Sequence, residues 1–367
     1  MHDISDEFTS HVTDGPAVSR PLREQYEEPY GPVVSVFNWT FNHRDFIRES
    51  IESILDQRTS FPVEIIIHDD ASTDGTAEIV REYSEKYPSL FRNVMQRENQ
   101  YSKGGNLLLP LAIYPRGRYV ALVDGDDFWT DPQKLQKQVD LLESDPQVVL
   151  TGHRFRLASA ESSDTGCLSM VERSRGGLED ILLRNYVHTS SAMFRNGILK
   201  PEMLVDPPDA GDWFIWVQLA KHGEIGFINE VMSGYRIHAG GVASGLSLKK
   251  KVASVSRTVP RLHRDFGPRY RQIMNQSLAD YRLQVAAQCL GQREPSVVVY
   301  GIWLWLRALQ LAPTFTMRHR LKATLQTQLV MVVQRYFNIS EYFRRSLRGF
   351  RRVVSKVIRG LLPTYFR

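Results

Sequence analysis

Residues 124–127 of the chain read DGDD and place three carboxylates in one short segment. Asp124 and Asp126 stand one residue apart, and carboxylates with this spacing at a strand end can share a hard divalent cation. Mg²⁺ or Mn²⁺ held in this way keeps positions open for substrate phosphate oxygens. A solvated acidic turn is the alternative interpretation. Because the segment directly follows the apolar run of residues 119–123, we favour the cation site.

A second acidic pair, Asp69 and Asp70, follows the apolar run of residues 63–67. A carboxylate held at a strand end can accept hydrogen bonds from the edge of a nucleobase. The segment also matches the opening of a calcium-binding EF-hand loop, but the twelfth position is Arg81, where a bidentate Glu is required. One of residues 72–74 can cap the helix that follows. Capping does not explain the acidic pair, so we expect a nucleotide contact here.

The acidic segments depend on strands that end at the same place. Residues 33–37, 63–67 and 119–123 are nearly continuous in apolar residues, as in strands buried on both faces of a parallel sheet. Residues 43–57 and 76–87 carry apolar side chains at helical spacing. This alternation predicts an α/β fold with a doubly wound, mostly parallel sheet. Ligands of such sheets bind outside the carboxyl ends of the strands.

Composition limits the class of protein. The chain has 367 residues, of which 42% are hydrophobic and 24% charged, which argues against a disordered, collagen-like or polytopic membrane protein. Its two cysteines, Cys167 and Cys289, cannot build a disulfide framework or a thiolate zinc site. The N-terminal ten residues lack the basic start and apolar core of a signal peptide. We therefore expect a cytoplasmic protein.

Four ordered motifs and a fifth short one resemble glycosyltransferase family 2. They read VVSVFNWTFNHRDFIRESIESILDQ, IIIHDDASTDGT, YVALVDGDDFWTDPQKLQKQ and AGDWFIWVQLAKHG, followed by YRIHAGG. The resemblance covers residues 31–245. It implies a GT-A fold and transfer of a sugar from a nucleotide-diphospho-sugar to a hydroxyl acceptor with inversion at the anomeric carbon. It also implies a Mn²⁺ or Mg²⁺ cofactor and a cell-surface glycan or lipid-linked acceptor.

The resemblance assigns donor-binding roles to five residues. Phe41 would stack on the base, Asp70 would hydrogen-bond its edge, and the backbone around Trp39 would line the same pocket. Lys103 and Asn106 lie in the KGGN loop, where the family often places donor-contacting groups. FNWTFN and His68 depart from the commoner family pattern, which puts base recognition in question and not the reaction class.

The cation, base and acceptor sites follow from the same comparison. Asp124 and Asp126 would form the DxD pair and His238 would complete the metal and pyrophosphate shell, although a histidine near a strand end can be a packing residue. Asp127 would be structural. Asp212 would be the catalytic base, since an inverting transfer needs one carboxylate that removes the acceptor proton; it can also cap its helix. The acceptor contacts would be His188, Thr189 and Trp213.

Two other function classes remain open at this stage. One is a non-catalytic sugar-nucleotide-binding or scaffolding subunit of the same fold. The other is a nucleotidyltransferase, for which we would expect a Gly-rich phosphate loop with Arg or Lys directly after the first strand. The chain has Asn38-Trp39-Thr40-Phe41 there, and a nucleotidyltransferase would release pyrophosphate instead of a nucleoside diphosphate.

The chain divides into four predicted parts. Residues 1–30 form a flexible leader, 31–245 the catalytic domain, 246–313 a helical region and 314–367 a basic amphipathic tail. The tail holds 12 Lys and Arg against one acidic residue, which leaves a net charge of −6 on residues 1–313. We expect the tail to dock the enzyme on the anionic cytoplasmic face of the membrane. Nucleic-acid binding by the tail is the alternative, and no specific nucleic acid is expected.

Overall fold

The structure is a computed structural model that falls into two compact units. It describes residues 20–24, 31–159, 166–167, 173–207, 211–241, 247–290 and 295–311. The first unit comprises Met1–Gly176, Tyr186–Asp206 and Gln218–His238, and the second comprises Gly177–Asn185, Pro207–Val217 and Ala239–Arg367. Most of the predicted leader and all of the predicted tail lie outside the described residues. The division into four parts stays a prediction.

The first unit contains all the described strands. They are β1 (Arg20–Pro21), β2 (Val34–Thr40), β3 (Arg58–Thr59), β4 (Val63–Asp69), β5 (Val94–Met95), β6 (Tyr119–Asp124), β7 (Phe128–Trp129), β8 (Val148–Ser159), β9 (Gly166–Cys167), β10 (Arg175–Gly176), β11 (Met193–Arg195) and β12 (Glu224–Ile237). Its helices are η1 (Leu22–Glu24), α1 (Ile47–Leu55), α2 (Thr76–Lys86), α3 (Pro110–Ile113), α4 (Lys134–Ser144), η2 (Thr189–Ser191) and η3 (Pro201–Leu204). Helix α6 (Gly211–Ala220) begins in the second unit and ends in the first.

Most strands join one mixed sheet in the order β10-β12-β8-β11-β6-β2-β4-β5, with β7 paired to β12 and β9 to β8. Strands β6, β2, β4 and β5 are parallel, and so are β8 and β12. Strand β11 is antiparallel to both β6 and β8 and joins the two parallel parts. The predicted α/β class with a mostly parallel sheet is confirmed.

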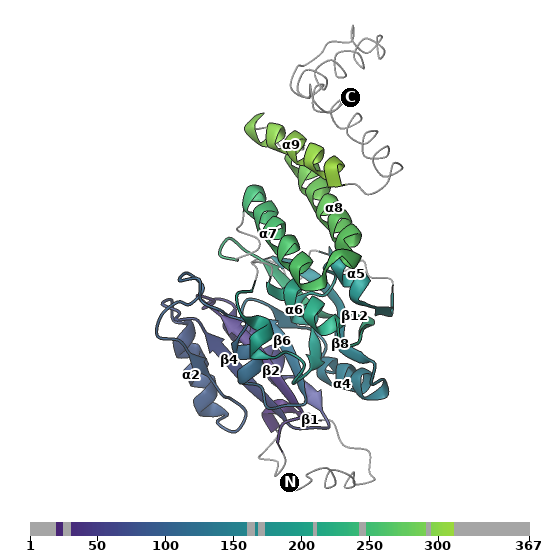
Figure 1. The fold of residues 1–367 in the computed structure, drawn as a ribbon. Helices are drawn as coiled ribbons and strands as arrows, with labels where there is room; N and C mark the ends of the chain where they lie inside the picture. Colours follow the sequence, from purple (N-terminus) through teal and green to yellow (C-terminus); the bar gives the residue numbers. More distant parts are fainter. Residues whose placement is uncertain are drawn as a thin grey trace, which may run out of the picture. The chain divides into compact units, whose positions relative to one another are not determined.

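The main core lies between one face of the sheet and helices α1, α2 and α4 (Figure 1). Every residue of β4 is buried, including the polar residues Glu64, His68 and Asp69 within and after its nearly continuous apolar run. Helix α1 turns Ile47, Ile51 and Ile54 toward the sheet at helical spacing. This packing fixes where the parallel strands end, and their carboxyl ends carry the acidic segments.

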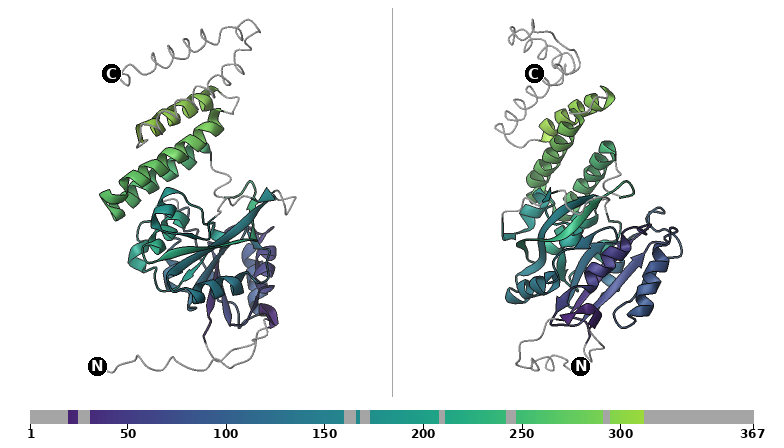
Figure 2. Two further views of the ribbon diagram at one scale, coloured as in Figure 1. Left: turned by 90° about the vertical axis from the view of Figure 1, so that its right-hand side faces the viewer. Right: turned by 180° about the vertical axis from the view of Figure 1, so that it is seen from behind.

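The second unit is helical, as expected for the C-terminal region. Its helices are α5 (Leu178–Leu183), α7 (Leu248–Phe266), η4 (Pro268–Tyr270), α8 (Arg271–Leu290) and α9 (Pro295–Leu311). Helices α8 and α9 pack side by side around a small core that includes Cys289 and Trp305 (Figure 2). Gly301 allows this approach, since a Cβ there would lie 2.8 Å from the Cβ of Cys289. No helix within the described ranges is long and apolar enough to cross a membrane.

Candidate active site

Three parallel strands bring the acidic segments to one edge of the sheet. In the register of β2 with its neighbours, Trp39 lies opposite Asp124 of β6, and Thr40 lies opposite Asp69 of β4. The strands therefore end level with one another. The predicted gathering of carboxylates at this edge is present in the structure.

Gly125 allows the DGDD segment to pass close to the end of β2. Its N–H donates to the carbonyl of Trp39 at 2.7 Å. A Cβ at position 125 would lie 2.6 Å from Oγ1 of Thr40 and 2.9 Å from Nδ1 of His43, so a side chain does not fit there. The glycine thus sets the position of the aspartates on either side of it.

Asp126 and His238 come together from distant parts of the sequence. Nε2 of His238 lies 2.9 Å from Oδ2 of Asp126, and both side chains are largely buried. A second imidazole, that of His43, places its Nε2 3.7 Å from the same oxygen. Burial lowers the pKa of His43, although the carboxylate of Asp126 opposes this shift. One carboxylate therefore faces two imidazoles, one of which the sequence analysis did not identify.

Arg236 fixes the backbone of the DGDD segment. Its guanidinium donates to the carbonyl of Asp126 at 2.8 Å and to Oε2 of Glu49 at 2.6 Å, and its backbone N–H donates to Oδ1 of Asp127 at 2.9 Å. The guanidinium carbon lies 4.8 Å from the ring centres of both Phe46 and Phe128. These contacts join the end of β12 to α1 and to the DGDD segment.

Asp127 is buried and has one oxygen, Oδ2, without a hydrogen-bond partner. Burial, followed by the charges of Asp126 and Asp124, raises the pKa of Asp127 well above its usual range. Nδ1 of His188 lies 4.0 Å from the unpaired oxygen. A buried carboxyl with these neighbours is suited to holding the DGDD turn in place, as the sequence analysis expected for Asp127.

His188 belongs to the same site in the first unit. Its ring contacts those of Phe155 and Tyr235, with centroids 4.6 and 4.5 Å away, and its Nδ1 accepts from the backbone N–H of Ser190. Burial lowers the pKa of His188 to about 4, so the imidazole is neutral at pH 7. Thr189 follows as the first residue of η2. Two of the three predicted acceptor residues, His188 and Thr189, thus lie beside the DGDD segment.

The predicted base-binding residues lie at the ends of β2 and β4. Phe41 is 41% exposed, which leaves its ring free to stack on a ligand. Asp70 is buried, and its two oxygens accept backbone N–H groups from Gln100 and Tyr101 at 2.7 and 3.0 Å. Trp39 donates its indole N–H to the carbonyl of Leu107 at 3.2 Å. Asp70 and Trp39 therefore also hold the loop that follows β5.

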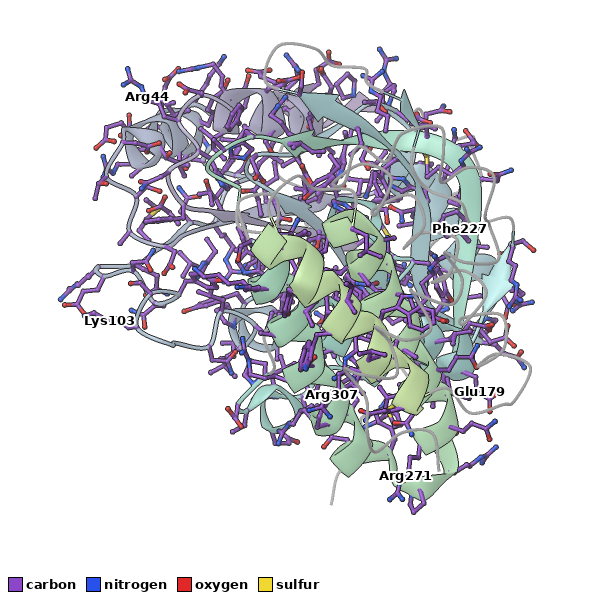
Figure 3. All side chains as sticks on the ribbon, turned by 90° about the horizontal axis from the view of Figure 1, so that it is seen from above. Arg44, Lys103, Glu179, Phe227, Arg271 and Arg307 are labelled. Atoms are coloured by element: carbon purple, nitrogen blue, oxygen red, sulfur yellow. The ribbon has the colours of Figure 1, made fainter. Side chains whose placement is uncertain are left out.

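The other two predicted donor residues differ in their surroundings. Lys103 is at the tip of this loop, where its side chain points outward and pairs with Glu98 (Figure 3). Asn106 is partly buried and caps the turn, since its side-chain oxygen accepts from Leu108 at 3.0 Å and its amide donates to the carbonyl of Leu204. Both assignments stay predictions, and the structure gives Asn106 a role in folding the loop.

Asp212 stands in the first turn of α6, in the second unit. Its carboxylate accepts from the backbone N–H of Trp213 at 2.6 Å and from the side-chain amide of Asn185 at 3.1 Å. Burial raises the pKa of Asp212, and the two hydrogen bonds oppose the shift. Trp213 is buried and donates its indole N–H to Ile181. The carboxylate is held in one orientation and is more basic than an exposed aspartate.

Few side chains at this edge of the sheet could act as metal ligands. Among the residues that the structure describes, no three His, Cys, Asp or Glu side chains are arranged to surround a metal ion. Asp126 and His238 provide one oxygen and one nitrogen donor that already lie within 2.9 Å of each other. This pair fits Mn²⁺ or Mg²⁺ only when other ligands, such as waters and phosphate oxygens, complete the coordination shell.

Comparison with known proteins gives the family. The profile of glycosyl transferase family 2 matches residues 35–201. TuaG of Bacillus subtilis, named as a teichuronic acid biosynthesis glycosyltransferase, is 30% identical over 253 residues, which cover 63% of this chain and 90% of TuaG. The chain belongs to glycosyl transferase family 2. WfaP of Escherichia coli is named as a UDP-Glc:α-D-GlcNAc-diphosphoundecaprenol β-1,3-glucosyltransferase. It is 27% identical to this chain, and the match covers 58% of this chain and 80% of WfaP.

A higher identity is found with Rv1520 of Mycobacterium tuberculosis, at 37% over 212 residues. The match covers 57% of this chain and 60% of that relative. Among solved structures, residues 1–349 of S. aureus TarS with UDP-GlcNAc have a TM-score of 0.58 at 17% identity, over 85% of this chain and 91% of that one. A Pyrobaculum calidifontis mannosyltransferase with GDP-Man and Mn²⁺ has a TM-score of 0.52 at 18% identity. That match covers 96% of this chain and 92% of the mannosyltransferase chain. The GT-A fold that the sequence predicts is confirmed.

Three residues of this site were not predicted from the sequence. His43, Glu49 and Arg236 all contact the DGDD segment or its partners. The spacing of Glu49 in a predicted helix marks it only as a solvent-facing residue. Arg236 stands two residues before His238 within the YRIH motif, and that position was the one available signal.

Proposed function

We propose that the chain is a divalent-cation-dependent, inverting glycosyltransferase that uses a nucleotide-diphospho-sugar donor. The observation that carries this proposal is the pair formed by Asp126 and His238, which meet at the carboxyl edge of the parallel strands beside Asp124. Family membership supports sugar transfer as the reaction. The names of WfaP, TarS with UDP-GlcNAc and the mannosyltransferase with GDP-Man support a nucleotide-activated donor.

The donor would bind across the ends of β2, β4 and β6. The exposed ring of Phe41 is suited to stacking on the base. Asp70 uses one lone pair of each oxygen for the loop, and each oxygen retains capacity for a further donor from the base edge. Asp124, at the end of β6, would contact the ribose or a metal-bound water. Lys103 and Asn106 remain candidates for further donor contacts.

Asp126 and His238 would hold the cation, as Mn²⁺ or Mg²⁺, together with the donor pyrophosphate. A bound divalent cation offsets the negative charge that accumulates on a departing nucleoside diphosphate. The chain contributes the orientation of the two ligands. Arg236 holds the carbonyl of Asp126, and Gly125 places the segment against Thr40. The mannosyltransferase with Mn²⁺ supports a metal of this class.

Asp212 would act as the base. Its carboxylate takes the proton of the acceptor hydroxyl while that oxygen bonds to the anomeric carbon and the bond to the diphosphate breaks on the opposite side. The pKa raised by burial makes this carboxylate a stronger proton acceptor at neutral pH. The hydrogen bonds from Asn185 and Trp213 hold it in place. His188, Thr189 and Trp213 are the candidates for acceptor contacts.

The acceptor would be a cell-surface glycan or a lipid-linked intermediate. The names of TuaG and WfaP, which refer to a wall polymer and to a diphosphoundecaprenol, support this class. An acceptor anchored in lipid would place the enzyme at the cytoplasmic face of the membrane. The basic tail of residues 314–367, which the sequence analysis assigned to membrane docking, lies outside the described residues and stays a prediction.

One assay separates this function from its alternatives. Purified enzyme is incubated with a panel of nucleotide-sugars, a lipid-linked saccharide acceptor and Mn²⁺, and the small products are identified. We expect a free nucleoside diphosphate and a product of inverted anomeric configuration. Pyrophosphate would indicate a nucleotidyltransferase. Donor binding without turnover, for an acceptor that a related enzyme uses under the same conditions, would indicate a non-catalytic subunit.

A further inference from the structure

Helix α9 has an apolar surface that the described residues only partly cover. Arg307 is its one charged residue. A helix that is apolar on all sides is normally buried on all sides. The small core of the second unit buries Leu304 and Trp305, whereas Trp303 is 45% exposed. Within the described part of the chain, α8 is the main element that packs on α9.

The exposed side of α9 carries an aromatic pair with a cation at each end. The rings of Tyr300 and Trp303 are stacked, with centroids 5.7 Å apart and planes at 17°. Nζ of Lys249, from α7, lies 5.5 Å from the centre of the Tyr300 ring, and the guanidinium carbon of Arg307 lies 5.4 Å from that of Trp303. Figure 3 labels Arg307 on α9. We call these four residues and Arg282 the aromatic–basic face.

This face carries an excess of positive charge. No carboxylate of the described residues forms an ion pair with Lys249, Arg282 or Arg307. Nε of Arg282 is buried without an acceptor, and burial, followed by the charge of Arg307, lowers the pKa of Arg282. Residues 247–290 and 295–311 together contain ten Lys and Arg and two Asp, a net charge of +8. The face therefore favours an anionic partner.

Charge also separates the possible occupants. The tail of residues 314–367 carries a net charge of +11, and a second copy of the chain would present the same basic helices, so like charges oppose both. A bilayer with anionic lipids provides negative charge together with an apolar layer. Each basic residue near such a surface contributes attraction, and tryptophan prefers the level of the headgroups. A soluble polyanion such as heparin offers charge but no apolar layer for Trp303.

We propose that the aromatic–basic face docks the second unit on a membrane that contains anionic lipids, with Trp303 inserted among the headgroups. Helix α9 lies in the plane of the interface, with Lys249, Arg282 and Arg307 at the lipid phosphates. The docking site is formed by α7, α8 and α9 and is separate from the tail that the sequence analysis assigned to the membrane. It does not depend on the catalytic assignments above.

An environment-sensitive fluorophore on the full-length chain tests the position of this face. Gln310 is exposed and accepts a hydrogen bond from Arg307 at 3.2 Å, so a label on Gln310→Cys in a Cys167→Ser background reports on the face and leaves Trp303 intact. We expect a blue shift and a rise in emission with phosphatidylglycerol vesicles, and no change with phosphatidylcholine vesicles. The same label on Ile113→Cys, an exposed site in the first unit, should not respond.

Two results of the label experiment would overturn the proposal. One is unchanged emission of the label at position 310 although the full chain sediments with anionic vesicles. This result would assign the binding to another surface. The other is an equal response to heparin, which would indicate a polyanion site instead of a membrane site.

Substitutions measure the contribution of the face. We expect Trp303→Ala to lower the partition coefficient on anionic vesicles about tenfold, and the double variant Lys249→Glu, Arg307→Glu to lower it by more than about thirtyfold, because two attractions are lost and two repulsions are added. Trp303→Tyr should restore most of the binding, since tyrosine also favours the interface. Ile113→Ala and Lys200→Glu are matched controls in the first unit. Wild-type partitioning by Trp303→Ala and by the double variant, both folded by circular dichroism, would refute the proposal.

Discussion

Nε2 of His238 lies 2.9 Å from Oδ2 of Asp126, although 112 positions separate the two residues in the chain. The contact depends on β12, which pairs with β7 directly after the DGDD segment and places Gly234 opposite Phe128. Two sequence motifs that are far apart thus provide one oxygen and one nitrogen at a single point. This is the arrangement on which the proposed cation dependence rests.

Asp126→Asn should weaken binding of the donor nucleotide at least tenfold in the presence of Mn²⁺, because the cation would lose its carboxylate ligand. EDTA should have the same effect on the wild type. Isothermal titration with and without Mn²⁺ measures both. Phe41→Ala is the control, since loss of base stacking should weaken nucleotide binding equally in the two conditions. Wild-type affinity of Asp126→Asn in Mn²⁺ would remove the cation assignment.

Asp212→Asn should lower the rate of sugar transfer by about 10² to 10⁴, the usual contribution of a positioned general base. Donor binding should stay within a few-fold of wild type, because the base acts on the acceptor. Single-turnover assays and donor titration separate the two effects. If the variant transferred sugar at a near-normal rate, another carboxylate would have to be the base.

The pH dependence of transfer should follow Asp212. The base is active only when ionised, and burial raises its pKa, so kcat/KM should fall with decreasing pH from a higher pH than for an exposed aspartate. Asn185→Ala removes a hydrogen bond that lowers this pKa. We therefore expect the acid limb to move to higher pH in that variant. An unchanged acid limb would show that Asp212 does not set it.

Gly125→Ala should destabilise the first unit by about 1–3 kcal/mol, the usual cost of forcing atoms into a packed site. The added Cβ would lie 2.6 Å from Thr40 Oγ1, and relief would move the DGDD segment away from β2. Urea unfolding measures the free energy. Gly31→Ala is the matched control, since no atom lies within 4 Å of a Cβ there. Equal stability of the two variants would contradict the close approach.

Arg236→Gln should cost about 1–3 kcal/mol of stability, because the carbonyl of Asp126 loses a buried donor. It should also weaken Mn²⁺-dependent donor binding, since Asp126 would no longer be held. Arg48→Gln removes an exposed arginine that pairs with Glu82, and exposed pairs contribute little. Urea unfolding with donor titration compares the two variants. A fully stable Arg236→Gln that binds the donor normally would show that the guanidinium contacts do not position the site.

The sequence predicted the parts of the fold whose signal is local. Strands β2, β4 and β6 contain nearly continuous apolar runs, and α1 and α2 have clear helical periodicity, so each was found within a few residues. Strands β8 and β12 were not predicted, because their inward residues include polar ones such as Thr151 and Ser233, which tertiary hydrogen bonds satisfy. The alternation of apolar and polar residues is weak in such strands.

In the site, too, only the residues with a local signal in the sequence or a family resemblance were predicted. Strand ends and the spacing of aspartates indicated Asp124 and Asp126 from local sequence, and family resemblance added His238 and Asp212. His43 and Glu49 could not be found, because their contacts depend on how β12 and the DGDD segment meet α1 and the loop before it. The contact of Glu49 with Arg236 spans 187 positions. Such pairing is a property of the packed sheet and leaves no mark in either segment.

The pairing of Gly234 with Phe128 also limits how the length of the chain can vary. A Cβ at position 234 would lie 2.3 Å from the Phe128 ring, so this residue is fixed in place. Side chains alternate between the two faces of a strand, and an insertion of one residue between Gly234 and Arg236 would turn Arg236 and His238 to the opposite face. A two-residue insertion would restore the face but displace both by nearly 7 Å. Insertions and deletions in related chains should therefore avoid residues 234–238 and fall in loops away from this edge of the sheet.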